Sequence, residues 1–208
     1  MKILLNNLLK KKLKKFRTIK PILTFSDGCK YSGMTKKDNK NIKKLIPEGL
    51  GYAIWPDGSY YEGQYKNGTF NGWGNYVSPG SHKLTGIWKN GFITKGEMKW
   101  EDGRYYVGEF KKSKFHGKGT MIVPDSYKYE GQWKDNLEHG KGKMTYLIDS
   151  KEKNWEKGTI LKGEFARGLQ HGRFEKIFPD GEVMDLVFKN NFNTKSKFRD
   201  QKKWTVYK

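Results

Sequence analysis

Glycines and large apolar residues alternate with polar residues along the chain, and this pattern repeats. A tyrosine or aliphatic residue is followed two positions later by a glycine and, two positions after that, by an aromatic residue. Tyr61, Gly63 and Tyr65 form one such copy, and further copies begin at residues 84, 106, 129 and 161. A degenerate copy begins at residue 184, and a seventh copy, followed by an insertion rich in Lys and Asn, begins at residue 31. Most steps are 22 or 23 residues, so we expect about seven related units.

Each copy also has a second half, and the two halves together predict a β-hairpin. The second half is illustrated by His116-Gly117-Lys118-Gly119, which is followed by alternating large residues such as Met121. Turn sequences such as Pro56-Asp57-Gly58 then separate one copy from the next. Period-two alternation, aromatic enrichment and regularly spaced Gly, Asn and Asp are typical of short antiparallel strands. The sequence therefore predicts an all-β protein with one hairpin per unit.

The central glycine of each copy needs a physical reason, because glycine usually weakens a strand. In Tyr61, Gly63 and Tyr65 the three positions point to the same side of a strand. We expect the glycine to leave a gap into which a large ring of the adjoining hairpin lies, so that aromatic packing compensates for the weak strand position. The glycines assigned this structural role are Gly63, Gly86, Gly108, Gly131 and Gly163.

The combined motifs Tyr-Glu-Gly-x-aromatic, Lys-Asn-Gly, His-Gly-x-Gly and Pro-Asp-Gly resemble the MORN (membrane occupation and recognition nexus) repeat between about residues 25 and 188. Leu84 and Leu161 depart from the first tyrosine of the motif, and Leu186 replaces its glycine, so the last unit is expected to cap the array. The resemblance implies an elongated single antiparallel sheet of stacked β-hairpins. It also implies a docking surface rather than a catalytic site.

The repeat divides the chain into three parts: a basic N-terminal segment at 1–20, the repeat array at 21–190 and a basic C-terminal arm at 191–208. In the first part, apolar residues with helical spacing predict a short amphipathic helix. These are Leu5, Leu9, Leu13 and Phe16. The cations beside them, a candidate surface for binding anions, are Lys10, Lys11, Lys12, Lys14, Lys15 and Arg17.

Several roles remain open for this N-terminal helix. A basic amphipathic helix can bind an anionic membrane, calmodulin or another acidic partner, or serve as a mitochondrial targeting segment. It can equally dock through its leucine face on a partner or on the array itself.

The formal net charge of +20 resides in the two ends of the chain. Residues 1–46 carry a net charge of +12 and residues 189–208 carry +6, whereas residues 47–188 carry only +2. A nearly neutral body does not offer a broad cationic face to phosphates. Lysine also outnumbers arginine by 37 to 5, which disfavours bidentate recognition of bases. Nucleic acid is therefore not expected as a partner.

The candidate chemical groups do not indicate an enzyme. His116, His139 and His171 occupy one repeat position, and equivalent positions in adjacent hairpins lie about 10 Å apart, too far to share a zinc ion. Cys29 is the single cysteine, which excludes a disulfide framework. No apolar run is long enough to span a membrane, and no secretory signal is evident. We expect no catalytic residue, no metal and no cofactor.

The leading hypothesis is a scaffold that links protein subunits of a large cytoskeletal assembly. The resemblance to MORN arrays of radial-spoke-head proteins implies a cytoplasmic setting in a ciliary or flagellar axoneme. Because one sheet cannot bury both of its faces, a partner subunit, a second copy or the chain's own tails should cover the aromatic stripe. This stripe contains Tyr65, Trp88, Phe110, Trp133 and Phe165. The rival hypothesis is a peripheral tether that binds anionic phospholipid or phosphoinositide through the N-terminal segment.

Overall fold

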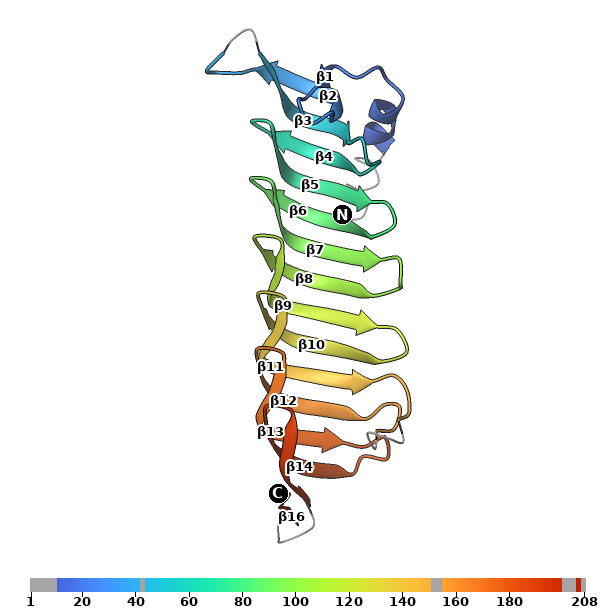
Figure 1. Cartoon of the computed structure of the whole chain (residues 1–208), viewed down its shortest axis with the longest axis vertical. Coiled ribbons are helices and arrows are strands. Elements are labelled where there is room, and N and C mark those ends of the chain that lie inside the picture. The colour runs from blue at the N-terminus through green and yellow to red at the C-terminus, as the bar shows by residue number, and fades with distance from the viewer. Residues whose placement is uncertain (1–10, 42–43, 151–154, 200–204, 207–208) are drawn as a thin grey trace. The chain divides into compact units, whose positions relative to one another are not determined.

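The computed structural model of the chain describes residues 11–41, 44–150, 155–199 and 205–206. The chain divides into two compact units, Met1–Glu101 (unit 1) and Asp102–Lys208 (unit 2). The described residues form sixteen strands, and their order in the antiparallel sheet is their order in the sequence (Figure 1). The prediction of an all-β protein built from consecutive antiparallel hairpins is therefore confirmed.

Unit 1 contains a short helical segment and seven strands among its described residues. Residues 11–14 are α-helical and continue into a 3-10 turn, η1 (Lys15–Arg17). The strands are β1 (Leu23–Thr24), β2 (Lys30–Lys37), β3 (Leu45–Ile54), β4 (Tyr60–Lys66), β5 (Thr69–Ser78), β6 (His82–Lys89) and β7 (Phe92–Trp100).

Unit 2 contains nine strands among its described residues. They are β8 (Tyr105–Lys111), β9 (Lys114–Val123), β10 (Tyr127–Lys134), β11 (Leu137–Tyr146), β12 (Ile160–Ala166), β13 (Leu169–Ile177), β14 (Val183–Lys189), β15 (Phe192–Phe198) and β16 (Thr205–Val206). Strand β15 pairs with β14 as the second strand of a hairpin. The sheet thus extends beyond residue 190, where the sequence placed the start of a C-terminal arm.

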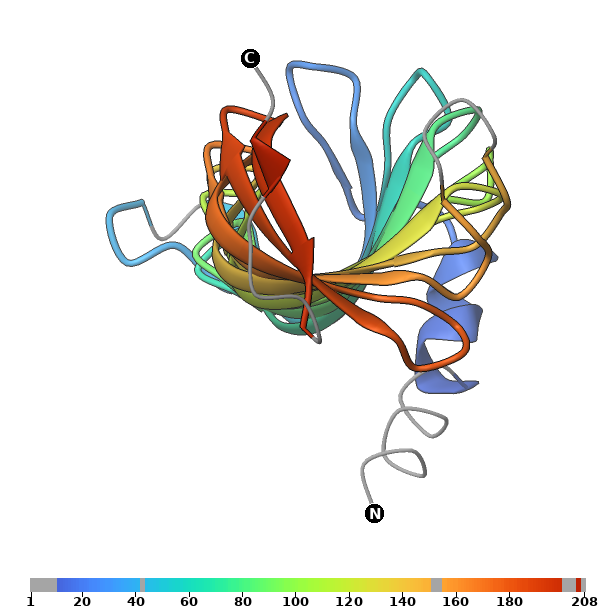
Figure 2. The same ribbon diagram turned by 90° about the horizontal axis from the view of Figure 1, so that it is seen from below.

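The sheet of each unit has two chemically different faces. In unit 1, the aromatic face carries Tyr61, Gly63 and Tyr65, whereas the polar face carries Glu62 and its cross-strand partner Asn75. Unit 2 has the same division, with tyrosines and phenylalanines on its aromatic face and alternating charges on its polar face. Figure 2 shows that the strands are curved and that the helical residues of unit 1 lie on the outer side of this curve.

Facing glycines form a row across the centre of each unit's sheet. Gly63 pairs with Gly74 within a hairpin, and Gly74 pairs with Gly86 of the next hairpin. In unit 2, Gly131 likewise pairs with Gly119 on one side and with Gly142 on the other. The full rows are Gly33, Gly51, Gly63, Gly74, Gly86 and Gly96 in unit 1, and Gly108, Gly119, Gly131, Gly142 and Gly163 in unit 2.

A tyrosine ring lies over a pair of these glycines. A Cβ atom at Gly142 would lie 2.6 Å from Cζ of Tyr129, and a Cβ at Gly131 would lie 2.5 Å from the same tyrosine's hydroxyl oxygen. That hydroxyl group donates a 3.0 Å hydrogen bond to the carbonyl oxygen of Gln132. The ring belongs to the same strand as Gly131. The expectation of a ring from the adjoining hairpin is therefore wrong for these glycines.

The same arrangement recurs wherever the repeat begins with tyrosine. The hydroxyl groups donate to the carbonyl oxygen three residues later, at distances of 2.6 to 3.1 Å. All four tyrosines are fully buried, and a buried hydroxyl group without a partner would cost free energy. This hydrogen bond supplies the partner. The four are Tyr31, Tyr61, Tyr106 and Tyr129.

Rings of neighbouring strands then pack against each tyrosine. Phe70 stacks on Tyr61 with ring centroids 3.7 Å apart, and Trp88 of the next hairpin meets the same tyrosine edge-to-face at 5.5 Å. In unit 2, Phe115 stacks on Tyr106 at 3.9 Å. Offset-stacked and edge-to-face pairs are the favoured aromatic geometries, so successive hairpins within each unit share one continuous aromatic core.

The first glycine of the His-Gly-x-Gly half has a different role. Gly72 and Gly117 have φ values of +85° and +65°, and both lie where the hairpin register shifts at a bulge. This backbone conformation strongly favours glycine. The side chain of Gln64 covers the bulge and accepts a 2.7 Å hydrogen bond from the backbone N–H of Trp73.

The two-residue turns inside the hairpins, such as the turn between β4 and β5, have two central residues with positive φ. Asn67 and Gly68 have φ values of 51° and 79°, which is the pattern of a type I′ turn and matches its Asn-Gly preference. The turn between β8 and β9 departs from this chemistry, because Lys112 and Ser113 adopt φ values of 49° and 60°. Side chains with a Cβ atom rarely adopt this conformation, so this turn is strained.

Replacing Lys112→Asn and Ser113→Gly together should therefore stabilise the protein. We expect a gain of about 1 kcal/mol in the free energy of unfolding, since a left-handed residue costs about 1–2 kcal/mol. Thermal unfolding followed by circular dichroism measures this change. The reverse exchange, Asn67→Lys with Gly68→Ser, serves as the control and should destabilise by a similar amount. An unchanged melting temperature in both variants would contradict the assignment of strain.

Gly131→Val should be destabilising because a side chain at this position meets both a ring and the backbone. Its Cβ would lie 2.7 Å from Cα of Gly142 as well as against Tyr129. Overpacking of this kind costs about 1–3 kcal/mol. Thr120→Val, on the polar face of β9, is the control and should be nearly neutral. Denaturant unfolding measures both, and equal stability of the two variants would refute the requirement for glycine.

Candidate interaction surfaces

The five rings predicted as the interaction stripe are buried within the chain itself. Their side chains are only 3–6% exposed. Tyr65 packs edge-to-face against Tyr61 at 5.2 Å, and Trp88 donates its indole N–H to the carbonyl oxygen of Gly74 at 3.2 Å. Neighbouring strands thus already cover the rings, which are Tyr65, Trp88, Phe110, Trp133 and Phe165. Contact of these rings with a partner stays a prediction.

An accessible aromatic surface does exist elsewhere on the aromatic face of unit 1. Here a hollow is lined by Phe25, Pro47, Trp55 and Phe70. Phe25, which follows β1, is 38% exposed at its rim. Trp55 packs edge-to-face on Phe70 at 6.2 Å and donates its indole N–H to Asp27 at 3.3 Å. This hollow, called the aromatic hollow below, can therefore accept an apolar group next to a carboxylate.

The deeper part of the aromatic hollow holds groups that stay uncharged. Burial raises the pKa of the Cys29 thiol to about 11 and the pKa of Tyr65 well above its usual value. The Tyr65 hydroxyl group is buried and has no hydrogen-bond partner in the described part of the chain. A neutral thiol is a poor nucleophile, so Cys29 lacks the activation that a catalytic cysteine requires. The hollow is suited to binding rather than to nucleophilic chemistry.

The N-terminal segment docks on the polar face of unit 1. Leu13 is fully buried and Phe16 is 8% exposed, and both pack with Trp73 in one small apolar cluster. Leu50 and Tyr52 of β3 complete this cluster. The structure therefore favours docking on the array among the roles that the sequence left open. Leu5, Leu9 and Lys10 lie outside the described residues.

An ion pair fixes the end of this docked segment. The Arg17 guanidinium donates two hydrogen bonds to one carboxylate oxygen of Glu62, at 2.9 and 2.5 Å. The same guanidinium lies over the rings of Tyr52 and Tyr60, at 5.9 and 5.3 Å from their centroids. The sequence analysis predicted that Arg17 contributes to binding an anionic surface. In the structure, Arg17 instead pairs with a carboxylate of its own chain. The lysines at 11, 12, 14 and 15 remain exposed.

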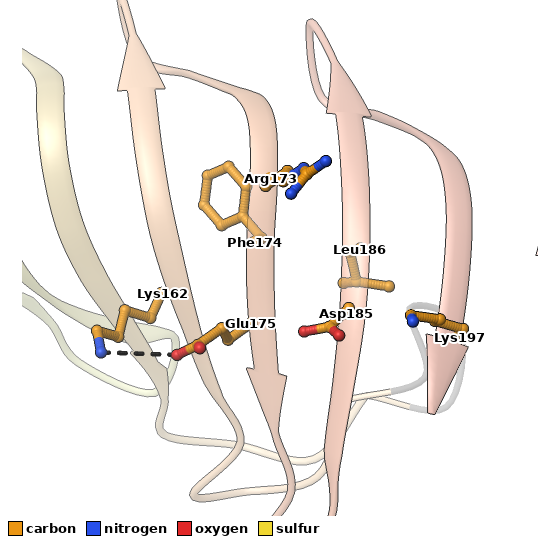
Figure 3. Close-up of a pocket in the computed structure, with 7 residues that line it drawn as sticks. All are labelled: Lys162, Arg173, Phe174, Glu175, Asp185, Leu186 and Lys197. Atoms are coloured by element: carbon orange, nitrogen blue, oxygen red, sulfur yellow. Dashed lines mark ion pairs between the residues drawn. The ribbon is translucent and has the colours of Figure 1, made fainter. Parts of the chain in front are cut away.

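A second hollow lies on the polar face of unit 2 and is lined mainly by charged residues (Figure 3). Lys162 lies 3.6 Å from Glu175, and Arg199 pairs with both Glu175 and Asp185. The hydrogen bond from Arg199 lowers the pKa of Glu175 below its usual value. Both carboxylates are paired with cations, and the lowered pKa of Glu175 keeps it ionised at neutral pH. The arrangement is typical of a solvated ion-pair network on a strand face.

The described residues show no grouping of three or more His, Cys, Asp or Glu side chains suited to holding a metal ion. His116 and His139 each lie opposite the bulge-covering residue of their own hairpin, Glu109 and Gln132 respectively. Within the same described ranges, no helix has the length and apolar character needed to cross a membrane.

Sequence reasoning missed the residues of the aromatic hollow. Trp55 and Phe70 belong to the turn and the second strand of a hairpin, outside the Tyr-x-Gly-x-aromatic motif that drew attention. Trp55 directly precedes the Pro56-Asp57-Gly58 turn, and an aromatic residue at a turn entrance was the available signal. The convergence of both residues with Phe25 depends on the sheet, which sequence spacing does not reveal.

Comparison with known proteins identifies the repeat. The MORN repeat family matches residues 61–82, 106–126, 129–146 and 162–183. These matches coincide with hairpins that begin at β4, β8, β10 and β12.

Solved structures resemble the chain only remotely. The G-box domain of the microcephaly protein CPAP has 12% identity and a TM-score of 0.37, and the match covers 86% of this chain and 97% of that domain. The wild-type TCP10 domain of Danio rerio CPAP, solved with a peptide of Danio rerio STIL, has 11% identity and a TM-score of 0.31. That match covers 86% of this chain and 92% of the domain. No curated protein matches the sequence significantly.

Proposed function

Since the chain belongs to the MORN-repeat proteins, we propose that it is a non-enzymatic scaffold that binds a protein partner through the aromatic hollow of unit 1. The observation that carries this proposal is the accessible group of rings around Phe25, Trp55 and Phe70, in a chain whose motif rings are buried. Exposed aromatic residues beside a polar rim are typical anchors of protein interfaces.

The chemistry of the aromatic hollow indicates the kind of partner. The rings and Pro47 provide an apolar contact area, and the Asp27 carboxylate lies at its edge. An apolar or aromatic side chain flanked by a basic residue would satisfy both features. The proposed partner is therefore a protein segment, and its setting is a large cytoskeletal assembly. Within that proposal, a ciliary axoneme with a radial-spoke-like complex is the specific location.

The partner should be lost when the rim of the hollow becomes charged. Phe25→Lys places a cation among the rings and should reduce recovery of the partner by about tenfold, the effect of losing roughly 1.4 kcal/mol of binding energy. Affinity purification from native cells followed by quantitative mass spectrometry provides the measurement. Phe192→Lys is the matched control, because Phe192 is 76% exposed and is not among the residues that line the hollow.

Two outcomes would overturn the scaffold proposal. One is equal recovery of all specific partners with Phe25→Lys and with the wild-type chain. The other is the absence of cytoskeletal or axonemal proteins among those partners, combined with diffuse localisation of the fluorescently tagged chain in ciliated cells.

Binding to an anionic membrane is a second candidate function, because the docked N-terminal segment keeps its lysines exposed. Each lysine near an anionic surface contributes about 1 kcal/mol to binding. The exposed lysines of residues 11–17, the helical part of this segment that the structure describes, are Lys11, Lys12, Lys14 and Lys15.

Replacing the N-terminal lysines by glutamine tests this second candidate by cosedimentation with phosphoinositide vesicles. If the membrane function is correct, binding by the wild-type chain is strong at low salt and disappears in the variant, since screening weakens exposed charges. Salt-resistant binding that is equal in both proteins would contradict it. The variant replaces Lys10, Lys11, Lys12, Lys14 and Lys15. The control replaces five exposed lysines of unit 2, namely Lys111, Lys112, Lys114, Lys134 and Lys157.

A further inference from the structure

One position of the repeat changes its chemistry where the N-terminal segment docks. This position precedes the row glycine, or its substitute, in the second strand of each hairpin and belongs to the polar face. It is occupied by Leu50 in β3 and by Trp73 in β5. The later hairpins have a basic residue there, in the order Lys95, Lys118, Lys141, Arg173 and Lys195.

The two apolar residues are the ones that the docked segment covers. Trp73 is 7% exposed and packs with Leu13 and Phe16, while Leu50 lies at the edge of the same cluster. A lysine at either position would place a charge beneath Leu13. The polar face of unit 1 is therefore built to receive an apolar helix face at this point.

The acidic part of this recess is positioned by the sheet rather than by the docked segment. Asn75 donates a 3.2 Å hydrogen bond to Glu62 Oε1, and Thr85 donates a 2.8 Å hydrogen bond to the side-chain oxygen of Asn75. These cross-strand contacts leave Glu62 Oε2 directed to Arg17. A preorganised carboxylate beside the rings of Tyr52 and Tyr60 favours a guanidinium group as its partner.

The recess continues beyond the docked segment. A hollow next to Lys14 and Arg17 extends along the polar face over Asn75 and Thr85 to Glu97, and Lys83 also lines it. The chain's own helix thus occupies one end of a longer surface that has carboxylates at both of its ends. A longer helix would make contacts with this surface that the N-terminal segment does not make.

We infer that this recess, formed by Leu50, Tyr52, Glu62 and Trp73, is a second binding site, distinct from the aromatic hollow. Its ligand is a basic amphipathic helix of a partner protein that carries leucine, an aromatic residue three positions later and then arginine. The chain's own residues 13–17 have this pattern and act as a tethered competitor.

Displacement is physically reasonable because few side chains hold the competitor. In the described part of the segment, the apolar contact is confined to Leu13 and Phe16, and the Arg17 side chain remains 44% exposed. Partly exposed ion pairs contribute little stability. The tether supplies a high effective concentration instead, so a partner helix must bind more tightly than the isolated N-terminal sequence does.

A labelled synthetic peptide of residues 1–20 serves as the probe, with full-length protein and fluorescence anisotropy at physiological salt. The variant Leu13→Ala with Phe16→Ala removes the competitor's anchors and should bind the peptide at least about tenfold more tightly than the wild type does. A peptide with the same two substitutions has the same charge and should not bind. Equal peptide affinity for wild type and variant would overturn the inference.

A second substitution locates the binding site. Trp73→Lys, added to the Leu13→Ala and Phe16→Ala variant, installs the residue type of the later repeats and so is compatible with the fold. It should weaken peptide binding by about tenfold or more, corresponding to at least about 1.4 kcal/mol. Ile87→Lys is the control, because Ile87 pairs with Trp73 across the strands and is 48% exposed. Similar effects of Trp73→Lys and Ile87→Lys would refute this site.

The occupant could instead be the N-terminal segment of a second copy, and sedimentation equilibrium separates the two cases. We expect a monomeric wild-type chain across the micromolar range. A wild-type dimer that Phe16→Ala dissociates would assign the recess to a second copy and overturn the inference of a partner helix.

Discussion

The packing of a tyrosine ring over two facing glycines is the contact on which the rest of each unit depends. The ring of Tyr129 occupies the space that side chains at Gly131 and Gly142 would need, and its hydroxyl group is satisfied by the backbone of the same strand. A ring held flat against the sheet leaves its outer surface and edge available to neighbouring rings. The aromatic core of consecutive hairpins is then a chain of such contacts, as expected for repeats stabilised by their nearest neighbours.

This constraint also separates the two faces functionally. The rings of the motif are buried by packing within the sheet. Docking on the aromatic face is therefore proposed for rings outside the motif, such as Trp55 and Phe70. On the polar face, the residue that precedes the row glycine differs between repeats. In unit 1 this position holds Leu50 and Trp73, whereas the later repeats have lysine or arginine there. Binding sites can thus differ between repeats while the fold is preserved.

The sequence predicts the hairpins well because their signals are local. Each signal lies within one repeat. These signals are the Tyr-x-Gly-x-aromatic spacing, the Asn-Gly turn at Asn67 and the turn glycines. Side-chain packing was harder to predict from the sequence. The ring over Gly131 comes from its own strand, and the burial of Trp88 depends on Tyr61 of the preceding hairpin. Docking of Leu13 was only one of several open roles. An alignment of the repeats by position does reveal Trp73 as unusual, but only the structure shows what covers it.

A double-mutant cycle between Tyr129 and Gly142 tests the central claim most directly. The three nearest atoms to a Cβ at Gly142 all belong to the Tyr129 side chain, so Gly142→Ala should destabilise strongly when that ring is present. In a Tyr129→Ala background the added methyl group enters the space that the ring has left. The account predicts that the double variant is more stable than the sum of the single effects by about 1 kcal/mol or more, measured by denaturant unfolding. Additive effects within about 0.5 kcal/mol would contradict it.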